Sequence, residues 1–202
     1  IKHIGEDMRS IKPTYVPAVP RIWEGVYNKI IGNVKKQGKE PIFNKFKAAA
    51  LNFNHYTAML TGKEKRPLKR SLFSALFARI IGLLGALLWL IPKKLGDILV
   101  FKKVLAATGG NLRASLSGGG ALPSYIDDFF RAIGVRILEG YGLTETSPVI
   151  SVNDMRNRGF KIGTVGKPIK NVEVKIADDG EILCKGPNVM MGYYKDEKLR
   201  SE

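Results

Sequence analysis

The sequence predicts an α/β fold: a mostly parallel sheet layer built around a βαβ unit with helices, followed by an antiparallel hairpin region. Two short runs, "LRASLS" and "VRILEGYG", flank the helical segment "LPSYIDDFFRAIG", in which Pro123 stands in the first turn and Gly134 closes the helix. Strand, tight turn, helix and strand within ~30 residues form a βαβ unit, so the two strands should be parallel neighbours. Downstream, "VEVKIADDGEILCKG" alternates on both sides of Asp178-Asp179-Gly180, which is typical of a hairpin.

The first half of the chain predicts helices. A short helix is expected at 6–12, and the run "KPTYVPAVP", with three prolines, must be extended or turning. Apolar spacing then predicts helices over 20–36, 41–62 and 95–110, the last of which ends at Gly109 or Gly110. We therefore expect one incomplete domain in three parts: a helical, basic part at 1–110, a βαβ part at 111–160 and a β-rich part at 161–202.

Residues 71–92, "SLFSALFARIIGLLGALLWLIP", are the most apolar part of the chain. A membrane span needs ~20 apolar residues, but Arg79 interrupts this stretch and leaves only a short clean run at 80–91. The first interpretation is a buried helix or helical hairpin, and the alternatives are an interfacial membrane-binding helix and a true span. Basic residues flank the stretch on both sides: Lys65, Arg66, Lys69, Arg70, Lys93 and Lys94.

The charge is concentrated in the same half. The chain has 33 Lys/Arg and 18 Asp/Glu, a net charge of +15, and 20 of the basic but only 6 of the acidic residues fall within 1–110. Such an excess indicates an anionic partner, such as a membrane surface, a nucleotide or a nucleic acid, unless it is only a solvated lysine-rich surface. A nucleic acid is not expected, because no defined module interleaves aromatic residues with the basic clusters.

The few cysteine and histidine residues limit which disulfides and metal sites the chain can form. Cys184 is the single cysteine, so no intramolecular disulfide is possible, and its place in an apparent strand predicts a buried, inert thiol in a reducing cytoplasm. His3 and His55 are far apart and lack ligand partners at metal-binding spacing, so no His/Cys metal cluster is expected.

Three glycines follow the first strand of the βαβ unit: Gly118, Gly119 and Gly120. A tight turn that requires positive φ would explain one of them, whereas three remove every side chain and let the backbone lie flat against a planar ligand. The next helix begins with free N–H groups, which favour an anion. Both this run and the one after the second strand leave the carboxyl ends of adjacent parallel strands, where ligands bind in open α/β sheets.

The second run, "GYGLTETSP", spans residues 140–148 and was expected to continue neither a helix nor a strand. Tyr141 is suited to stack on a base, although a tyrosine also anchors many turns without a further role. Thr144 offers a hydroxyl donor, and the carboxylate of Glu145 suits Mg²⁺ better than a phosphate. The residues alone therefore predict a nucleotide site.

The segment "SGGGALPSYIDDFFRAIGVRILEGYGLTETSPVIS" resembles the central signature of AMP-forming acyl-CoA synthetases, the adenylate-forming superfamily. The following "GTVGKPIKNVEVKIADDGEILCKGPNVMMGYYKDE" is similar to the next segment of that family, and "RSIKPTYVPAVPRIWEGVYNKI" resembles its long-chain fatty-acid–CoA ligase branch. The resemblance covers nearly the whole chain, and 35–95 is its least distinctive part. It implies part of the large N-terminal domain of an adenylate-forming enzyme.

The resemblance also implies roles for individual residues. Tyr141 would stack on adenine, with Glu139, Gly140 and Gly142 around the base, and Gly118–Gly120 would lie beside adenine and the acyl pocket. Thr144 would contact the α-phosphate and Glu145 would hold Mg²⁺, which makes these two the catalytic candidates. This chain has Gly120 where alanine is commoner and Ala121 where proline is common, changes that would widen the pocket.

The implied reaction uses ATP, Mg²⁺ and CoA. A fatty acid attacks the α-phosphate of ATP to give acyl-adenylate and pyrophosphate, and the CoA thiol then displaces AMP. The family's phosphate loop, its ribose-binding Thr-Gly-Asp and its lysine-bearing small domain do not occur in these residues, so the 202-residue chain is expected to be inactive alone. The resemblance implies a cytoplasmic protein. If residues 71–103 bind anionic lipid, the protein would lie on the inner face of a membrane. The alternatives are another acyl or aryl adenylating enzyme, or a non-catalytic membrane-surface module with this fold.

Overall fold

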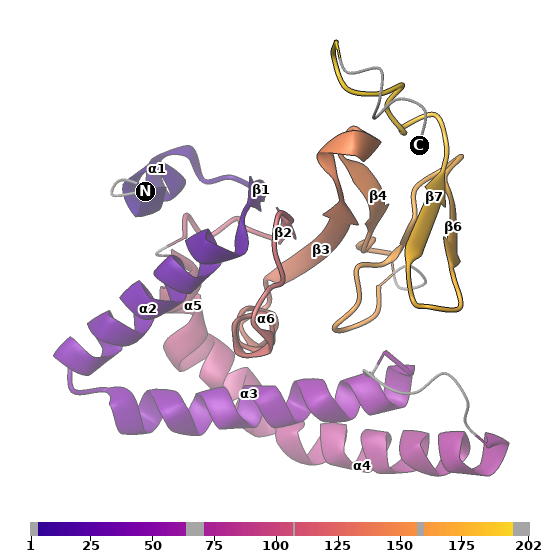
Figure 1. The fold of residues 1–202 in the computed structure, drawn as a ribbon. Helices are drawn as coiled ribbons and strands as arrows, with labels where there is room; N and C mark the ends of the chain where they lie inside the picture. Colours follow the sequence, from indigo (N-terminus) through magenta and orange to yellow (C-terminus); the bar gives the residue numbers. More distant parts are fainter. Residues whose placement is uncertain (1–3, 64–70, 107, 157–159, 196–202) are drawn as a thin grey trace.

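The computed structural model describes residues 4–63, 71–106, 108–156 and 160–195. They form a five-stranded sheet and a separate two-stranded one (Figure 1). The larger sheet has the order β1 (Tyr15–Ala18), β2 (Ala114–Ser117), β3 (Arg136–Gly142), β4 (Val149–Val152), β5 (Lys167–Pro168). The first three strands are parallel, whereas β4 and β5 are added antiparallel. The predicted α/β class is confirmed.

The predicted βαβ unit consists of β2, helix α6 (Ser124–Ala132) and β3. β2 and β3 are parallel neighbours, with Ser117 opposite Glu139, so both strands end at the same edge of the sheet. β1 was not predicted as a strand: the proline-rich run pairs with β2, Val16 opposite Ser115, so the first 110 residues are not only helical. Within the described part of the chain, β1 has a neighbour on one side only, and such a position tolerates Pro17.

The helices of the first half lie close to their predicted positions. They are α1 (Ile4–Ile11), α2 (Pro20–Lys36), α3 (Glu40–Thr61) and α4 (Leu72–Gly96), which continues through a π-helical turn (Asp97–Phe101) into α5 (Lys102–Ala106). α3 ends where predicted, at Gly62, which has the left-handed backbone (φ 68°) common after a helix. Residues 64–70, which include the basic residues before the apolar stretch, lie outside the described residues.

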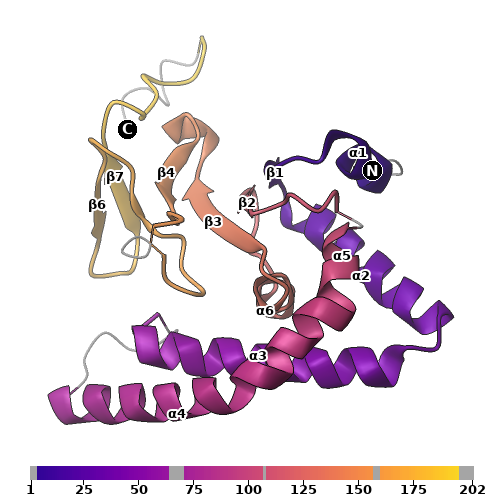
Figure 2. The ribbon, with the colours of Figure 1, turned by 180° about the vertical axis from the view of Figure 1, so that it is seen from behind.

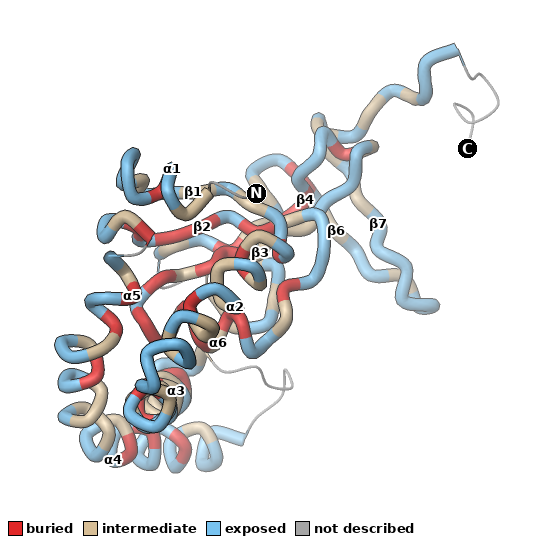
Figure 3. Tube along the Cα trace, turned by 90° about the vertical axis from the view of Figure 1, so that its left-hand side faces the viewer, coloured by how far each residue is buried: buried red, intermediate tan, exposed pale blue. Residues whose placement is uncertain are grey.

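The core lies between the parallel strands and helices α2, α3, α5 and α6, where the buried residues gather in Figure 3. Trp23 of α2 is fully buried, and its ring meets the edge of Phe130 with centroids 5.0 Å apart. Phe129 and Phe43 extend this aromatic cluster toward α3. The cluster holds α6 beneath the sheet and so fixes β2 and β3, which carry the candidate site.

The apolar stretch 71–92 is neither buried nor a hairpin, so the first interpretation was wrong. It belongs to the single helix α4, which lies along α3 (Figure 2). Its buried residues are Ala78, Gly82, Gly85 and Gly96, a narrow stripe of small residues. Large apolar side chains cover the other sides and remain exposed among the described residues, for example Leu84 (62%) and Leu88 (72%). The reason is geometric: α3 covers one side of a helix that is apolar all round.

By length and composition alone, the continuous stretch Leu72–Ala106 could cross a membrane, and only 11% of its most apolar window is buried. One such helix is weak support for a span, because core helices of soluble proteins meet the same criteria.

The predicted hairpin is formed by β6 (Glu173–Ile176) and β7 (Ile182–Lys185). Its turn is as expected: Gly180 has a φ of 91°, and the side chain of Asp179 accepts a hydrogen bond from the Glu181 N–H at 3.0 Å. Cys184 lies in β7 but is only partly buried, contrary to the prediction. The hairpin contributes no residue to the main core, so its residues are mostly exposed.

Candidate functional site

The glycine strip follows β2 and lies next to the end of β3. The atom nearest to a Cβ built on Gly118 would be the carbonyl oxygen of Gly140, at 3.9 Å. Of the three glycines, Gly119 has a left-handed backbone (φ 76°), whereas Gly118 and Gly120 are not at positive φ. The conformation of the turn therefore accounts for Gly119 alone, and the other two leave the backbone uncovered on this side.

β3 ends at Gly142, as the strand run "VRILEGYG" predicted, but this contradicts the expectation that residues 140–148 continue no strand. Tyr141 and Gly142 belong to this strand and pair with β4, Tyr141 opposite Ser151, so the run 140–148 does continue a strand. The register shifts between Tyr141 and Gly142, which makes a bulge. A Cβ on Gly142 would lie 1.7 Å from the carbonyl oxygen of Pro148, so only glycine fits where the two strands meet.

A short 3₁₀ turn, Thr144–Thr146, joins β3 to β4. The buried hydroxyl of Thr146 holds the turn: it accepts a hydrogen bond from the Leu143 N–H and lies 3.0 Å from the carbonyl oxygens of Leu143 and Pro148. Thr144 is exposed and Glu145 is half-buried, so both side chains remain accessible at the tip of the hairpin.

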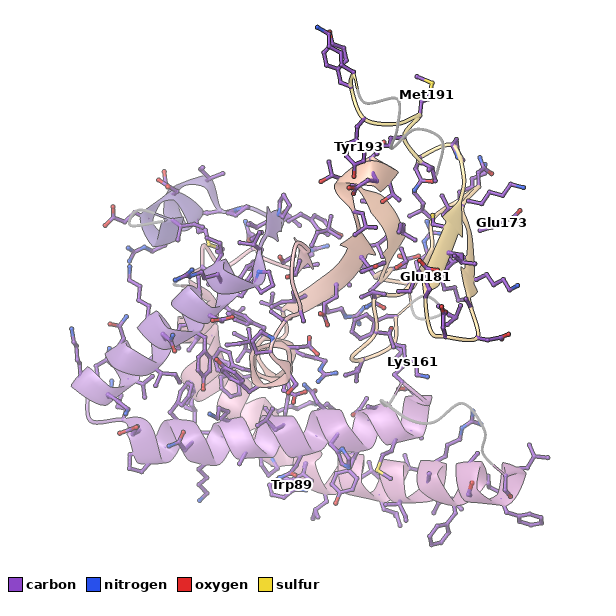
Figure 4. The ribbon with its side chains drawn as sticks, viewed as in Figure 1. Trp89, Lys161, Glu173, Glu181, Met191 and Tyr193 are labelled. Atoms are coloured by element: carbon purple, nitrogen blue, oxygen red, sulfur yellow. The ribbon has the colours of Figure 1, made fainter. Side chains whose placement is uncertain are left out.

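Glu145 is held by the last described segment of the chain. The hydroxyl of Tyr193, which is labelled in Figure 4, donates a hydrogen bond to Glu145 Oε1 at 2.5 Å. The Met190 N–H donates to the Glu145 carbonyl at 2.8 Å. The hydrogen bond from Tyr193 lowers the pKa of the Glu145 carboxyl and, in turn, the carboxylate raises the pKa of Tyr193. Glu145 is therefore ionised at neutral pH, as a cation ligand must be.

Glu139 has a different neighbourhood. Its carboxylate accepts a hydrogen bond from the Leu122 N–H at 3.2 Å, which ties β3 to the chain just after the glycine strip. It lines a cavity of about 780 Å³ between α3, α6 and residues 162–165, together with Asp127 and Arg131. Burial there raises the pKa of Asp127 to about 6, against the opposite effect of Arg131. Tyr141, Thr144 and Glu145 do not line this cavity.

The structure thus brings together Gly118, Gly140 and their strand ends, and it places Thr144 and Glu145 on the adjoining turn. Glu145 fits Mg²⁺ carried by a nucleotide, since Mg²⁺ is usually bound through one or two carboxylates, several waters and substrate phosphates. A site made by the protein alone does not fit, because the described residues contain no group of three His, Cys, Asp or Glu that could hold a metal.

Two residues of this region, Tyr193 and Thr146, were not predicted from the sequence. Tyr193 stands 48 positions after its partner Glu145, and no spacing rule connects them. Thr146 is one of two threonines around Glu145, and only the structure shows that it faces inward while Thr144 faces outward.

The chain is similar in sequence to known proteins over most of its length. The family described as AMP-binding enzyme matches residues 2–194. The chain is 36% identical over its whole length to the long-chain-fatty-acid–CoA ligase FadD15 of Mycobacterium bovis, of which it covers 30%. It is 34% identical to the probable acyl-activating enzyme 16, chloroplastic, of Arabidopsis thaliana, with 97% of this chain and 29% of that protein covered.

Among solved structures, the chain is similar to the O-succinylbenzoate coenzyme A synthetase (MenE) from Bacillus subtilis in complex with ATP and magnesium ion. The identity is 32% and the TM-score 0.38, over 45% of this chain and 21% of that one. The chain thus spans about 30% of the length of the curated relatives that it matches. Since the family match covers nearly all of the residues, the chain belongs to the AMP-binding enzyme family.

Proposed function

We propose that this chain is the central part of a long-chain fatty-acid–CoA ligase. The complete protein would activate a fatty acid with ATP to acyl-adenylate and pyrophosphate, and then form the CoA thioester with release of AMP. The observation that supports this most is the joint edge of β2 and β3, where Gly118 lies beside Gly140 and the Tyr141–Glu145 segment follows along the chain. Ligands bind at such edges in α/β sheets.

Within this proposal, the strip of Gly118, Gly119 and Gly120 receives the adenine and the start of the acyl chain. Tyr141 stacks on the base between Gly140 and Gly142. Glu139, two residues earlier on β3, ties this strand to the chain after the glycine strip through its hydrogen bond with the Leu122 N–H. Thr144 donates its hydroxyl to the α-phosphate. Glu145 holds Mg²⁺, which when bound offsets the negative charge of the phosphates.

The reaction is tested with the full-length protein that contains this chain. Fatty-acid-dependent exchange of pyrophosphate into ATP is expected, with long-chain acids preferred over aryl acids. Exchange that depends instead on an aromatic acid would make the protein another adenylating enzyme. If no carboxylic acid supports exchange, the protein is instead a non-catalytic membrane-surface module with this fold.

Replacing Tyr141 with alanine is expected to weaken ATP binding by about 1–3 kcal/mol, because the stacking surface for the base is lost. ATP affinity measured by calorimetry on the full-length protein checks this. Tyr125→Ala serves as a matched control, since Tyr125 is half-exposed on α6, where its ring contacts that of Tyr27. Equal ATP affinity in the Tyr141 variant and the wild type would refute the stacking role.

A finer part of the proposal concerns the membrane. We propose that the exposed apolar surface of α4 rests on anionic lipid, where the fatty acid substrate is dissolved. Arg79, Lys94 and Lys102 are exposed along α4 and α5, so the apolar helix also carries positive charge. Its one carboxylate between residues 72 and 106 is that of Asp97, which is paired with Lys93 at 2.5 Å and so repels anionic headgroups less. Apolar area and basic charge together favour an interfacial helix.

For this surface, the double variant Leu84→Gln/Leu88→Gln is expected to lose co-sedimentation with phosphatidylserine-containing vesicles. Both side chains are largely exposed, so the substitutions leave the core intact. Ile42→Gln on α3, also exposed, is the control for a general loss of surface hydrophobicity. If wild-type full-length protein does not bind the vesicles, α4 is covered by another part of the protein and the membrane proposal is wrong.

A further inference from the structure

The last described segment of the chain returns to the hairpin tip that carries Glu145. Three hydrogen bonds join them. The Asn188 side-chain amide donates to the Val149 carbonyl at 2.9 Å, and the Met190 N–H donates to the Glu145 carbonyl at 2.8 Å. The third runs from the Tyr193 hydroxyl to Glu145 Oε1 at 2.5 Å.

The three hydrogen bonds have two different structural roles. The first two hold the backbone of the segment against the β3–β4 hairpin, so the segment is anchored without the phenol of Tyr193. The third reaches a side chain, and it occupies one oxygen of the carboxylate. Apart from a hydrogen bond from its own backbone N–H, the Glu145 carboxylate accepts no other hydrogen bond within the described part of the chain, and it stays accessible to a cation.

We propose that Tyr193 is a positioning residue that holds the Glu145 carboxylate in the orientation needed to bind the cation of a nucleotide. This inference rests on the proposed function, because it takes Glu145 as the Mg²⁺ ligand. A carboxylate on an exposed turn would otherwise rotate freely, and a short hydrogen bond to one oxygen fixes where the other points. Partners of metal ligands generally act in this way.

The neighbouring Tyr194 supplies a matched control. It has the same side chain one position later, but it is 89% exposed and its ring contacts Lys195 rather than the hairpin. Tyr193→Phe and Tyr194→Phe each remove one hydroxyl from the same segment. A general effect on the fold of the segment would appear in both variants, whereas an effect on Glu145 appears in the first alone.

The experiment measures Mn²⁺ binding by electron paramagnetic resonance, with full-length protein and a non-hydrolysable ATP analogue. Tyr193→Phe is expected to raise the dissociation constant for Mn²⁺ about 10-fold, with the affinity for the metal-free analogue unchanged and Tyr194→Phe equal to wild type. In a Glu145→Gln background, Tyr193→Phe should have no further effect, since it acts through that carboxylate.

An equal Mn²⁺ affinity in Tyr193→Phe and wild type, both binding the analogue, would overturn the inference and leave the proposed function in place. An additional loss in the Glu145→Gln background would also overturn it, because Tyr193 would then act by another route. If the wild type fails to bind the analogue at all, the nucleotide site itself is wrong, and the inference falls with it.

Discussion

Gly142→Ala is expected to remove most of the adenylation activity of the full-length protein. The added methyl group would lie 1.7 Å from the carbonyl oxygen of Pro148 and 2.9 Å from the Cα of Val149, both backbone atoms of the opposite side of the hairpin. Neither can rotate away, so β3 and β4 must separate. A shift of about 1 Å in catalytic groups can cost about 100-fold in rate, and overpacking of this kind costs about 1–3 kcal/mol in stability.

The measurement is pyrophosphate exchange together with a thermal melting curve. Gly25→Ala is the matched control, because Gly25 is exposed in α2 and an added Cβ there meets nothing within 4 Å. That variant should keep full activity and melt at the same or a slightly higher temperature, since alanine favours a helix. Wild-type exchange by Gly142→Ala would show that the hairpin geometry is not needed for the reaction.

Trp23→Ala is expected to lower the free energy of unfolding by about 3–5 kcal/mol, the usual cost of removing a large aromatic side chain from a core. The indole of Trp23 is fully buried and contacts the ring of Phe130 on α6. Its removal leaves a cavity under the βαβ unit. The site should therefore suffer indirectly, because α6 supports β2 and β3.

Urea unfolding followed by circular dichroism measures this effect. Trp89→Ala is the natural comparison, because Trp89 is the other tryptophan, lies partly exposed on α4 and does not belong to the main core (Figure 4). Trp89→Ala should lower the free energy of unfolding by clearly less than Trp23→Ala. Equal destabilisation by both substitutions would mean that α4 contributes to the core as much as α2 does.

The sequence was sufficient for features that depend on local chemistry. The βαβ unit, the β6–β7 turn and the end of α3 at Gly62 each follow from residues that are close together in the chain. β1 could not be predicted in the same way. Its proline excludes it from the middle of a sheet, and its pairing depends on β2, which lies nearly 100 residues later.

The same distinction applies to the site. Tyr141, Thr144 and Glu145 were identified from residue type and from a family resemblance, and their roles remain predictions. The partner of Glu145 could not be found, because the Tyr193 hydrogen bond arises from the return of a distant segment. The exposure of α4 was also missed, since apolar composition does not reveal how many sides of a helix its neighbours can cover.

The pairing of β1 with β2 has a consequence for synthesis on the ribosome. Val16 pairs with Ser115, so 99 positions separate the partners, and at roughly 5–20 residues per second the second strand follows the first by about 5–20 s. During that interval α3 and α4 can form their local contact, whereas β2, with which β1 pairs, has yet to emerge and the apolar side chains of α4 are already outside the ribosome. Nascent chains of this protein should therefore need a chaperone between the emergence of α4 and that of β2.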